Sequence, residues 1–282
     1  HPLSRRQRQM CIRDSYAAMP VYDPVIQAVG GMVDVQGADP KLDGTPRFMR
    51  SILCDKTTAM TMSQALTAAL LSRERTGKGQ QLELTMIDAA IAFNWCDVMW
   101  SNTFVGEGAT ETDDLADAFE ARKALDGYVL AIPSTLAQFR GMCVVLDLPD
   151  LADDPRFQTP QGLFDNREEI RERLNAIIAT RQVEELCAAL IANNVPCAPV
   201  VPRNELHANP QVAHLGSVLE GDHPLGGRVR YPRHPTQFHR TPAGAETLAP
   251  RSGQHTRELL EEAGLSVEEV EGLASAGAVA LG

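Results

Sequence analysis

A helix pattern, a glycine turn, a strand pattern and a second helix pattern follow one another between Asp55 and Thr103, and this order constrains the fold more than any other stretch. Small and apolar side chains recur at three- and four-residue spacing after Asp55, which predicts a helix with one buried face. These side chains are Ala59, Met62, Ala65, Leu66, Ala69 and Leu70. Gly77 ends the helix, GQQLELT predicts a strand, and Met86 begins a second helix. This order is typical of an α/β fold with a parallel sheet covered by helices.

Asp55 stands at an expected strand-to-helix junction. The apolar run from Phe48 to Leu53 predicts a buried strand, and a short helix is expected to begin near Pro24 and end at Gly30. Two interpretations of Asp55 stay open. It is an N-cap whose carboxylate accepts backbone N–H bonds, or a nucleophile or base at the carboxyl end of a parallel strand, and one side chain can serve in both ways.

Composition narrows the class of protein. With 282 residues, 44% of them apolar and 22% charged, the chain has the profile of a soluble protein of two domains. No apolar window approaches the length of a membrane helix or of a signal-peptide core, so we expect a cytoplasmic protein with no membrane partner. The net charge of -11 argues against a nucleic-acid surface. Six widely separated cysteines predict reduced, mostly buried thiols.

The sequence contains none of the common phosphate, dinucleotide or zinc motifs. There is no Walker loop, no G-x-G-x-x-G and no G-x-S-x-G elbow. Lys78 lies between two glycines, but this triplet follows a helix pattern and is interpreted as a helix end. His223, His234 and His239 share no zinc spacing, which favours loop histidines and predicts no metal site. Residue chemistry alone therefore leads to an α/β enzyme-like protein with Asp55 as its one candidate residue.

The later part of the chain predicts a second, mostly helical region. A strand is expected at Tyr128–Ile132 and helices around Leu136–Leu146, around Ile170–Ile178 and at Val183–Ala192. From Val195 onward the proline-rich segments VPCAPVVP, HPLGG and RYPRHP predict irregular chain, and one or two short helices are expected at the end.

The first 15 residues do not fit either region. The chain opens on His1, and RRQRQMCIRDS resembles translated sequencing adapter. We therefore expect residues 1–15 to be non-native and leave them out of the fold prediction. The alternative is a basic arm that is disordered or binds nucleic acid.

The order of landmarks resembles the family III CoA-transferases of the CaiB/BaiF type. YDPVIQAVGGM precedes a glycine- and proline-rich loop, Asp55 and AALLSRERTGKGQQLELTMIDAA, and then come DGYVLAI, LPDLADDPRF, NNVPCAPV and HTRELLEEAGLS. The likeness implies a Rossmann-like large domain with a smaller α+β domain. The large domain would be incomplete, because the N-terminal part of the family has no counterpart here. By matching, 16–104 is the partial large domain, 105–118 a linker, 119–231 the small domain and 232–282 a return to the large domain.

The resemblance also implies an activity. Asp55 falls on the catalytic aspartate of the family, which moves CoA from an acyl-CoA to a carboxylic acid through an aspartyl anhydride and an aspartyl-CoA thioester. Coenzyme A and acyl-CoA would be substrates, with no permanently bound cofactor. Most CoA-contacting residues of the family lie in the N-terminal part that has no counterpart here. Family members form interlocked homodimers, so the implied partner is a second copy of the chain.

Tyr22 matches an aromatic active-site position of formyl-CoA transferases, where it would bind or orient the substrate; core packing is the alternative. The α-methylacyl-CoA racemases share the fold but have histidine there and a glycine-rich run after the aspartate. Tyr22 and the Lys56-Thr57-Thr58 run therefore favour a transferase. The glycine-rich loop of formyl-CoA transferases is replaced by GEGATETDDLADA, which argues against oxalate as the acceptor. A racemase-like enzyme and an inactive, truncated dimerisation module remain alternatives, and the two acids are not identified.

Overall fold

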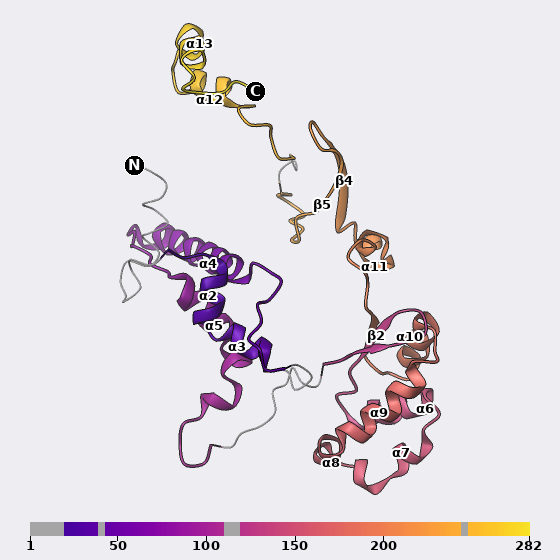
Figure 1. The fold of residues 1–282 in the computed structure, drawn as a ribbon. Helices are drawn as coiled ribbons and strands as arrows, with labels where there is room; N and C mark the ends of the chain where they lie inside the picture. The colour runs from indigo at the N-terminus through magenta and orange to yellow at the C-terminus, as the bar shows by residue number, and fades with distance from the viewer. Residues whose placement is uncertain (1–19, 39–42, 110–118, 244–247) are drawn as a thin grey trace. The chain divides into compact units, whose positions relative to one another are not determined.

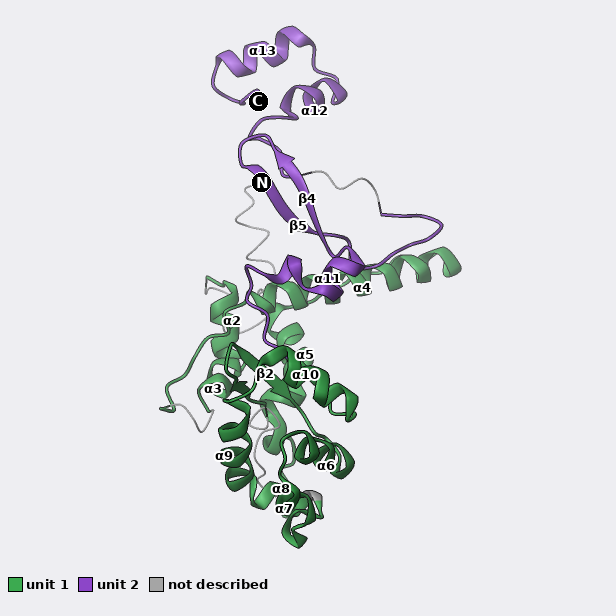
Figure 2. Cartoon of the chain, turned by 90° about the vertical axis from the view of Figure 1, so that its right-hand side faces the viewer, with its two compact units in different colours: residues 1–198 green, residues 199–282 purple. Residues whose placement is uncertain are grey.

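The computed structural model describes residues 20–38, 43–109, 119–243 and 248–282. Its chain divides into two compact units, residues 1–198 and residues 199–282, which Figure 2 shows in green and purple. Helices and short strands both occur, as a mixed α and β class requires. Residues 1–15, predicted to be non-native, and residues 110–118 of the predicted linker lie outside the described residues.

The first part of unit 1 is a group of helices, drawn in indigo to magenta in Figure 1. They are α2 (Asp23–Val29), α3 (Met32–Gly37), α4 (Leu53–Thr76), α5 (Met86–Met99) and the 3-10 turn η2 (Trp100–Thr103). Helices α4 and α5 pack together, and α2 contacts both. A small core joins them, formed by Ile26, Met32, Cys54, Met86 and Ala90. The short helix near Pro24 and the long helix that ends at Gly77 are thus confirmed.

The two strands predicted for this part are not formed. Residues 48–52 and 79–85 are irregular, and α4 already begins at Leu53. A strand persists only where a neighbouring strand takes its N–H and C=O groups. Among the described strands none pairs with either segment. The prediction of these two strands is therefore wrong, although the glycine turn and the helices around them are correct.

The rest of unit 1 is a small sheet with helices. Strands β1 (Ala121–Lys123), β2 (Tyr128–Ala131) and β3 (Cys197–Pro199) pair in the order β1-β2-β3. The helices are α6 (Leu136–Val145), α7 (Pro149–Asp153), η4 (Pro155–Phe157), α8 (Pro160–Asp165), α9 (Arg167–Ile178) and α10 (Val183–Ala192). The strand near Tyr128 and the helices predicted at 136–146, 170–178 and 183–192 are confirmed.

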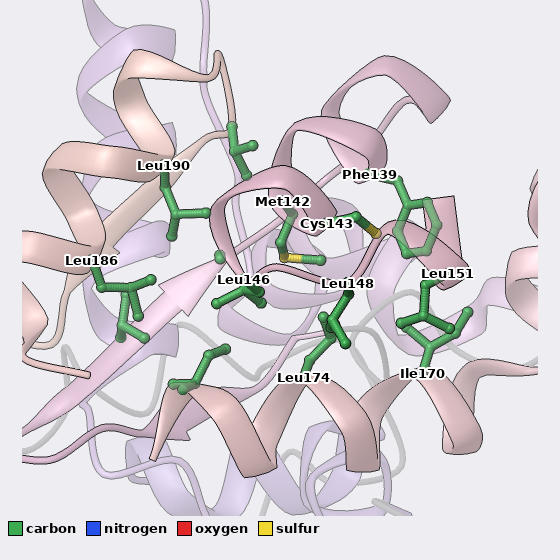
Figure 3. Close-up of a cluster of buried hydrophobic side chains, with 14 of the residues drawn as sticks. Phe139, Met142, Cys143, Leu146, Leu148, Leu151, Ile170, Leu174, Leu186 and Leu190 are labelled. Atoms are coloured by element: carbon green, nitrogen blue, oxygen red, sulfur yellow. The ribbon is translucent and has the colours of Figure 1, made fainter. Parts of the chain in front are cut away.

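A large apolar core holds this second part together. Figure 3 shows Leu174 of α9 in one cluster with Met142 of α6, Leu146 just after α6, and Leu186 and Leu190 of α10. All five side chains are buried. Because burial of a leucine-sized side chain contributes about 1.5–3 kcal/mol, this cluster stabilises its own fold more than the small core around α2 can.

Unit 2 contains a β-hairpin between short helices. Its elements are η5 (Leu206–Ala208), α11 (Pro210–Leu215), β4 (Val218–His223), β5 (Gly227–Pro232), α12 (Thr256–Glu262) and α13 (Val267–Ser275). The hairpin is antiparallel, with Val218 opposite Pro232 and His223 opposite Gly227. It corrects the prediction of irregular chain: Pro224 lies in the turn and Pro232 at a strand end, where a missing N–H is tolerated. The two C-terminal helices are confirmed.

Candidate functional site

Asp55 lies in the first turn of α4. The helix begins at Leu53 with Ile52 as its N-cap residue, so Asp55 is the third helical residue, and its side chain is exposed. The N-cap interpretation of Asp55 is therefore wrong. A carboxylate in the first turn is still favoured, because the N-terminal end of a helix carries partial positive charge.

The start of α4 is capped from another helix. Asp23 of α2 accepts a hydrogen bond from the Asp55 backbone N–H at 3.0 Å through Oδ2, and one from Gln27 Nε2 at 2.5 Å through Oδ1. Gln27 also donates to the Ser51 carbonyl at 3.0 Å and accepts from the Met49 N–H at 3.1 Å. Asp23 and Gln27 are only 4% and 2% exposed. This buried pair fixes both the segment before α4 and the backbone that carries Asp55.

Sequence reasoning missed Asp23 and Gln27. Their four-residue spacing places them on one face of α2, but polar residues at that spacing are common on solvated helices. A buried capping pair differs from a solvated one by its contact with the start of α4, and no signal in the sequence reveals that contact.

The neighbouring thiol is a poor nucleophile. Cys54 is buried, and burial raises its pKa from 9.0 to about 11, with the negative charges of Asp23 and Asp55 adding to the effect. The group therefore stays a neutral thiol near neutral pH, whereas the thiolate is the reactive form. Of the two adjacent side chains, the exposed carboxylate of Asp55 is the candidate for covalent chemistry.

A shallow pocket of about 410 Å³ adjoins the start of α4. Its lining residues are Asp23, Pro24, Gln27, Phe48, Met49, Arg50, Ser51, Ile52 and Lys56. Asp55 is not among these residues, but its chain neighbour Lys56 is, and so is Asp23, which accepts the hydrogen bond from the Asp55 N–H. The pocket therefore combines apolar walls, two cations and the buried Asp23 next to the start of α4.

Tyr22 directly precedes Asp23 at the start of α2. Its carbonyl accepts hydrogen bonds from the N–H groups of Val25 at 2.9 Å and Ile26 at 3.3 Å, and its side chain is 74% exposed. Asp23 links Tyr22 to Asp55, because it directly follows Tyr22 in the chain and accepts the hydrogen bond from the Asp55 N–H. The part played by the Tyr22 ring stays a prediction.

The other candidate residues do not gather into a site. Over the residues that the structure describes, no group of three or more His, Cys, Asp or Glu side chains is placed to hold a metal ion. His223 instead accepts hydrogen bonds from Leu225 and Gly226 in the hairpin turn. The five described cysteines are free thiols, and three of them are buried, namely Cys54, Cys143 and Cys187, while Cys197 is partly exposed and Cys96 exposed. For these residues the expectation of reduced, mostly buried thiols is confirmed. No described helix combines the length and apolar character needed to cross a bilayer.

Comparison with known proteins places the chain in a family. The family model described as CoA-transferase family III matches residues 13–256. The chain belongs to this family. The match begins well before Tyr22 and includes Asp55, α4, the small sheet and the hairpin, so the resemblance found in the sequence is confirmed.

Named relatives and a solved structure agree with this result. A succinyl-CoA:glutarate CoA-transferase of Mus musculus is 26% identical over 245 residues, 86% of this chain and 55% of the relative. A formyl-CoA:oxalate CoA-transferase of Escherichia coli O157:H7 is 26% identical over 286 residues, 90% of this chain and 66% of the relative. The crystal structure of a CaiB/BaiF family protein from Brucella suis matches with a TM-score of 0.73 and 25% identity, over 89% of this chain and 65% of that one. The chain thus spans about half the length of the mouse relative.

Proposed function

We propose that the protein to which this chain belongs transfers CoA from an acyl-CoA to a carboxylic acid, with Asp55 as the nucleophile. Coenzyme A thioesters and carboxylic acids are its substrates. The observation that carries the proposal is the exposed Asp55 carboxylate at the start of α4, on a backbone fixed by the buried Asp23 and Gln27, in a chain of CoA-transferase family III.

The reaction runs through two covalent forms of Asp55. The carboxylate attacks the donor thioester, which gives a mixed anhydride with Asp55 and a free CoA thiolate. The thiolate then attacks the aspartyl carbonyl, releases the donor acid and leaves Asp55 as its CoA thioester. The acceptor carboxylate attacks that thioester, which breaks the C–S bond, releases CoA thiolate and gives a second anhydride. The released thiolate then attacks the acyl carbonyl that comes from the acceptor. The new acyl-CoA leaves, and the free carboxylate is restored.

The position of Asp55 suits these steps. Each attack creates negative charge on a carbonyl oxygen, and backbone N–H groups in the first turn of a helix can stabilise such charge. Asp23 occupies the N–H of Asp55 itself, which holds the turn in place. The neutral thiol of Cys54 does not compete with the carboxylate as a nucleophile.

The experiment replaces Asp55 and a matched aspartate in the full-length protein. Asp88 is the third residue of α5, as Asp55 is of α4, and it also lies in the first turn of its helix. We expect Asp55→Ala to lose exchange of CoA between acids and Asp88→Ala to keep it. With an acyl-CoA donor, hydroxylamine should convert Asp55, but not Asp88, to a hydroxamate that mass spectrometry detects.

The same assays separate the alternatives. Undiminished transfer by Asp55→Ala would exclude the mechanism. Deuterium uptake at the acyl α-carbon without exchange of acids would identify a racemase-like enzyme, in which Asp55 carries a proton. Neither reaction in the full-length protein would leave dimerisation as its remaining function.

We also propose that the protein forms a homodimer. Helices α4 and α5 expose large apolar side chains, namely Met60, Leu66, Leu70, Leu71 and Phe93. Exposed apolar groups on adjacent helices are typical of surfaces that are covered in an assembly. Sedimentation equilibrium of the full-length protein should give twice the mass of one chain, and a monomer at all concentrations would contradict the proposal.

A further inference from the structure

The pocket beside Asp55 carries two cations that have no carboxylate partner within the described part of the chain. Arg50 is exposed, and Lys56 Nζ donates a hydrogen bond to the Ser51 hydroxyl at 3.4 Å. The nearby Arg47 differs, because its guanidinium pairs with Asp43 at 3.3 Å. Arg50 and Lys56 therefore line the pocket without a carboxylate partner among the described residues.

Asp23 does not neutralise these cations. Both of its carboxylate oxygens accept hydrogen bonds from inside the fold, one from the Asp55 N–H and one from Gln27, and it is 4% exposed. A ligand that enters the pocket thus meets two exposed cations and a buried acid whose oxygens already accept hydrogen bonds. An anion is the ligand that this arrangement favours.

The remaining walls define the shape of that anion. Phe48 and Ile52 supply apolar surface, and the pocket volume of about 410 Å³ suits a short chain. A guanidinium and an ammonium together suit a carboxylate, which a guanidinium can bind through two parallel hydrogen bonds. Methylene groups would lie along the apolar wall between this carboxylate and the acyl carbon at Asp55.

We propose that Arg50 and Lys56 bind the second carboxylate of a dicarboxylic acid whose first carboxylate reacts at Asp55. The proposal rests on the proposed CoA-transferase function and names its substrate class. It assigns specificity to two residues that contact the part of the acid that does not react.

The test compares two acceptors that differ by one carboxylate. Glutarate and pentanoate have the same number of carbon atoms, so the ratio of their kcat/KM values isolates the contribution of the second carboxylate. We expect the full-length protein to prefer glutarate, and Arg50→Met and Lys56→Met each to lower that ratio about 10- to 100-fold, the range for loss of a hydrogen bond between charged groups. Arg47→Met, which removes an ion-paired cation outside the pocket lining, should leave the ratio unchanged.

An unchanged ratio in Arg50→Met and Lys56→Met would overturn the proposal. So would an equal loss with both acids and a raised KM for the acyl-CoA, because the two cations would then bind a phosphate of CoA. If the protein transfers CoA to neither of these two acids, ligand binding tests the site directly. Equilibrium binding of radiolabelled glutarate should be lost in Arg50→Met and retained in Arg47→Met, and pentanoate should compete only weakly. Equal binding of glutarate by the two variants would overturn the proposed site.

Discussion

Replacement of Asp23 by alanine should loosen the start of α4 and leave other helices intact. The substitution removes a buried carboxylate that accepts bonds from the Asp55 N–H at 3.0 Å and from Gln27 at 2.5 Å. Gln27 keeps its bond to the Ser51 carbonyl, so the main loss is the cap on Asp55. Loss of a charge-assisted bond that leaves a donor unpaired costs about 2 to 4 kcal/mol.

Asp126 provides a matched control. Its carboxylate accepts a hydrogen bond from the Val183 N–H at 2.9 Å, so a loop aspartate caps the start of α10 in the same way. Asp126 is exposed, whereas Asp23 is buried. Water can therefore replace the lost bond at α10, and Asp126→Ala should cost only about 1 kcal/mol.

Hydrogen–deuterium exchange followed by mass spectrometry measures the two effects locally. In Asp23→Ala the peptide that contains the first turn of α4 should exchange about 30- to 1000-fold faster, while the α10 peptide is unchanged. Asp126→Ala should show the reverse pattern, with about a fivefold change at α10. Equal, small effects at the two helix starts would refute the reasoning that burial makes the Asp23 cap the stronger one.

Three further outcomes follow from burial and close packing. The pKa of Cys54 is about 11 in the folded protein and 9.0 for an ordinary thiol, so the unfolded chain loses this proton first as the pH rises. The free energy of unfolding should therefore fall between pH 9 and pH 11, and this fall should be smaller in Cys54→Ala. Leu174→Ala should lower the free energy of unfolding, measured by chemical denaturation, by about 3 kcal/mol, because the side chain is 1% exposed in the large core. The control Leu225→Ala, at a site 72% exposed, should lower it by less than about 0.5 kcal/mol. Gly141→Ala should destabilise by about 1 to 3 kcal/mol. An added Cβ would lie 2.5 Å from the Asn193 carbonyl oxygen, and this steric clash outweighs the gain in helix propensity from alanine. A higher melting temperature in Gly141→Ala would contradict the prediction.

Local patterns explain why most helices were predictable. Gly77 adopts a φ of 70°, the left-handed conformation that ends a helix, and the residue type alone indicates it. The buried positions of α9, Ile170, Leu174 and Ile178, recur at the spacing from which the helix was predicted. These signals are contained in short stretches of sequence, so they need no knowledge of distant residues.

The failed strands show the opposite case. GQQLELT has the composition of a strand, but a strand is defined by the hydrogen bonds of its neighbour, and no described strand pairs with it. The hairpin at 218–232 was missed for a related reason, because its prolines predicted irregular chain. The structure places Pro224 in the turn and Pro232 at the strand end opposite Val218, where no N–H is required.

The order of landmarks, the periodicity and the residue types are properties of the chain, so the family, most of the longer helices and Asp55 as the candidate residue could be read from them. The position of Asp55 as the third residue of α4, and the cap that Asp23 places on its N–H from another helix, became known from the folded chain. The tertiary structure also brought Arg50 and Lys56 to one pocket. Burial and capping depend on what packs against a side chain, and a contact between residues 32 positions apart leaves no local signal.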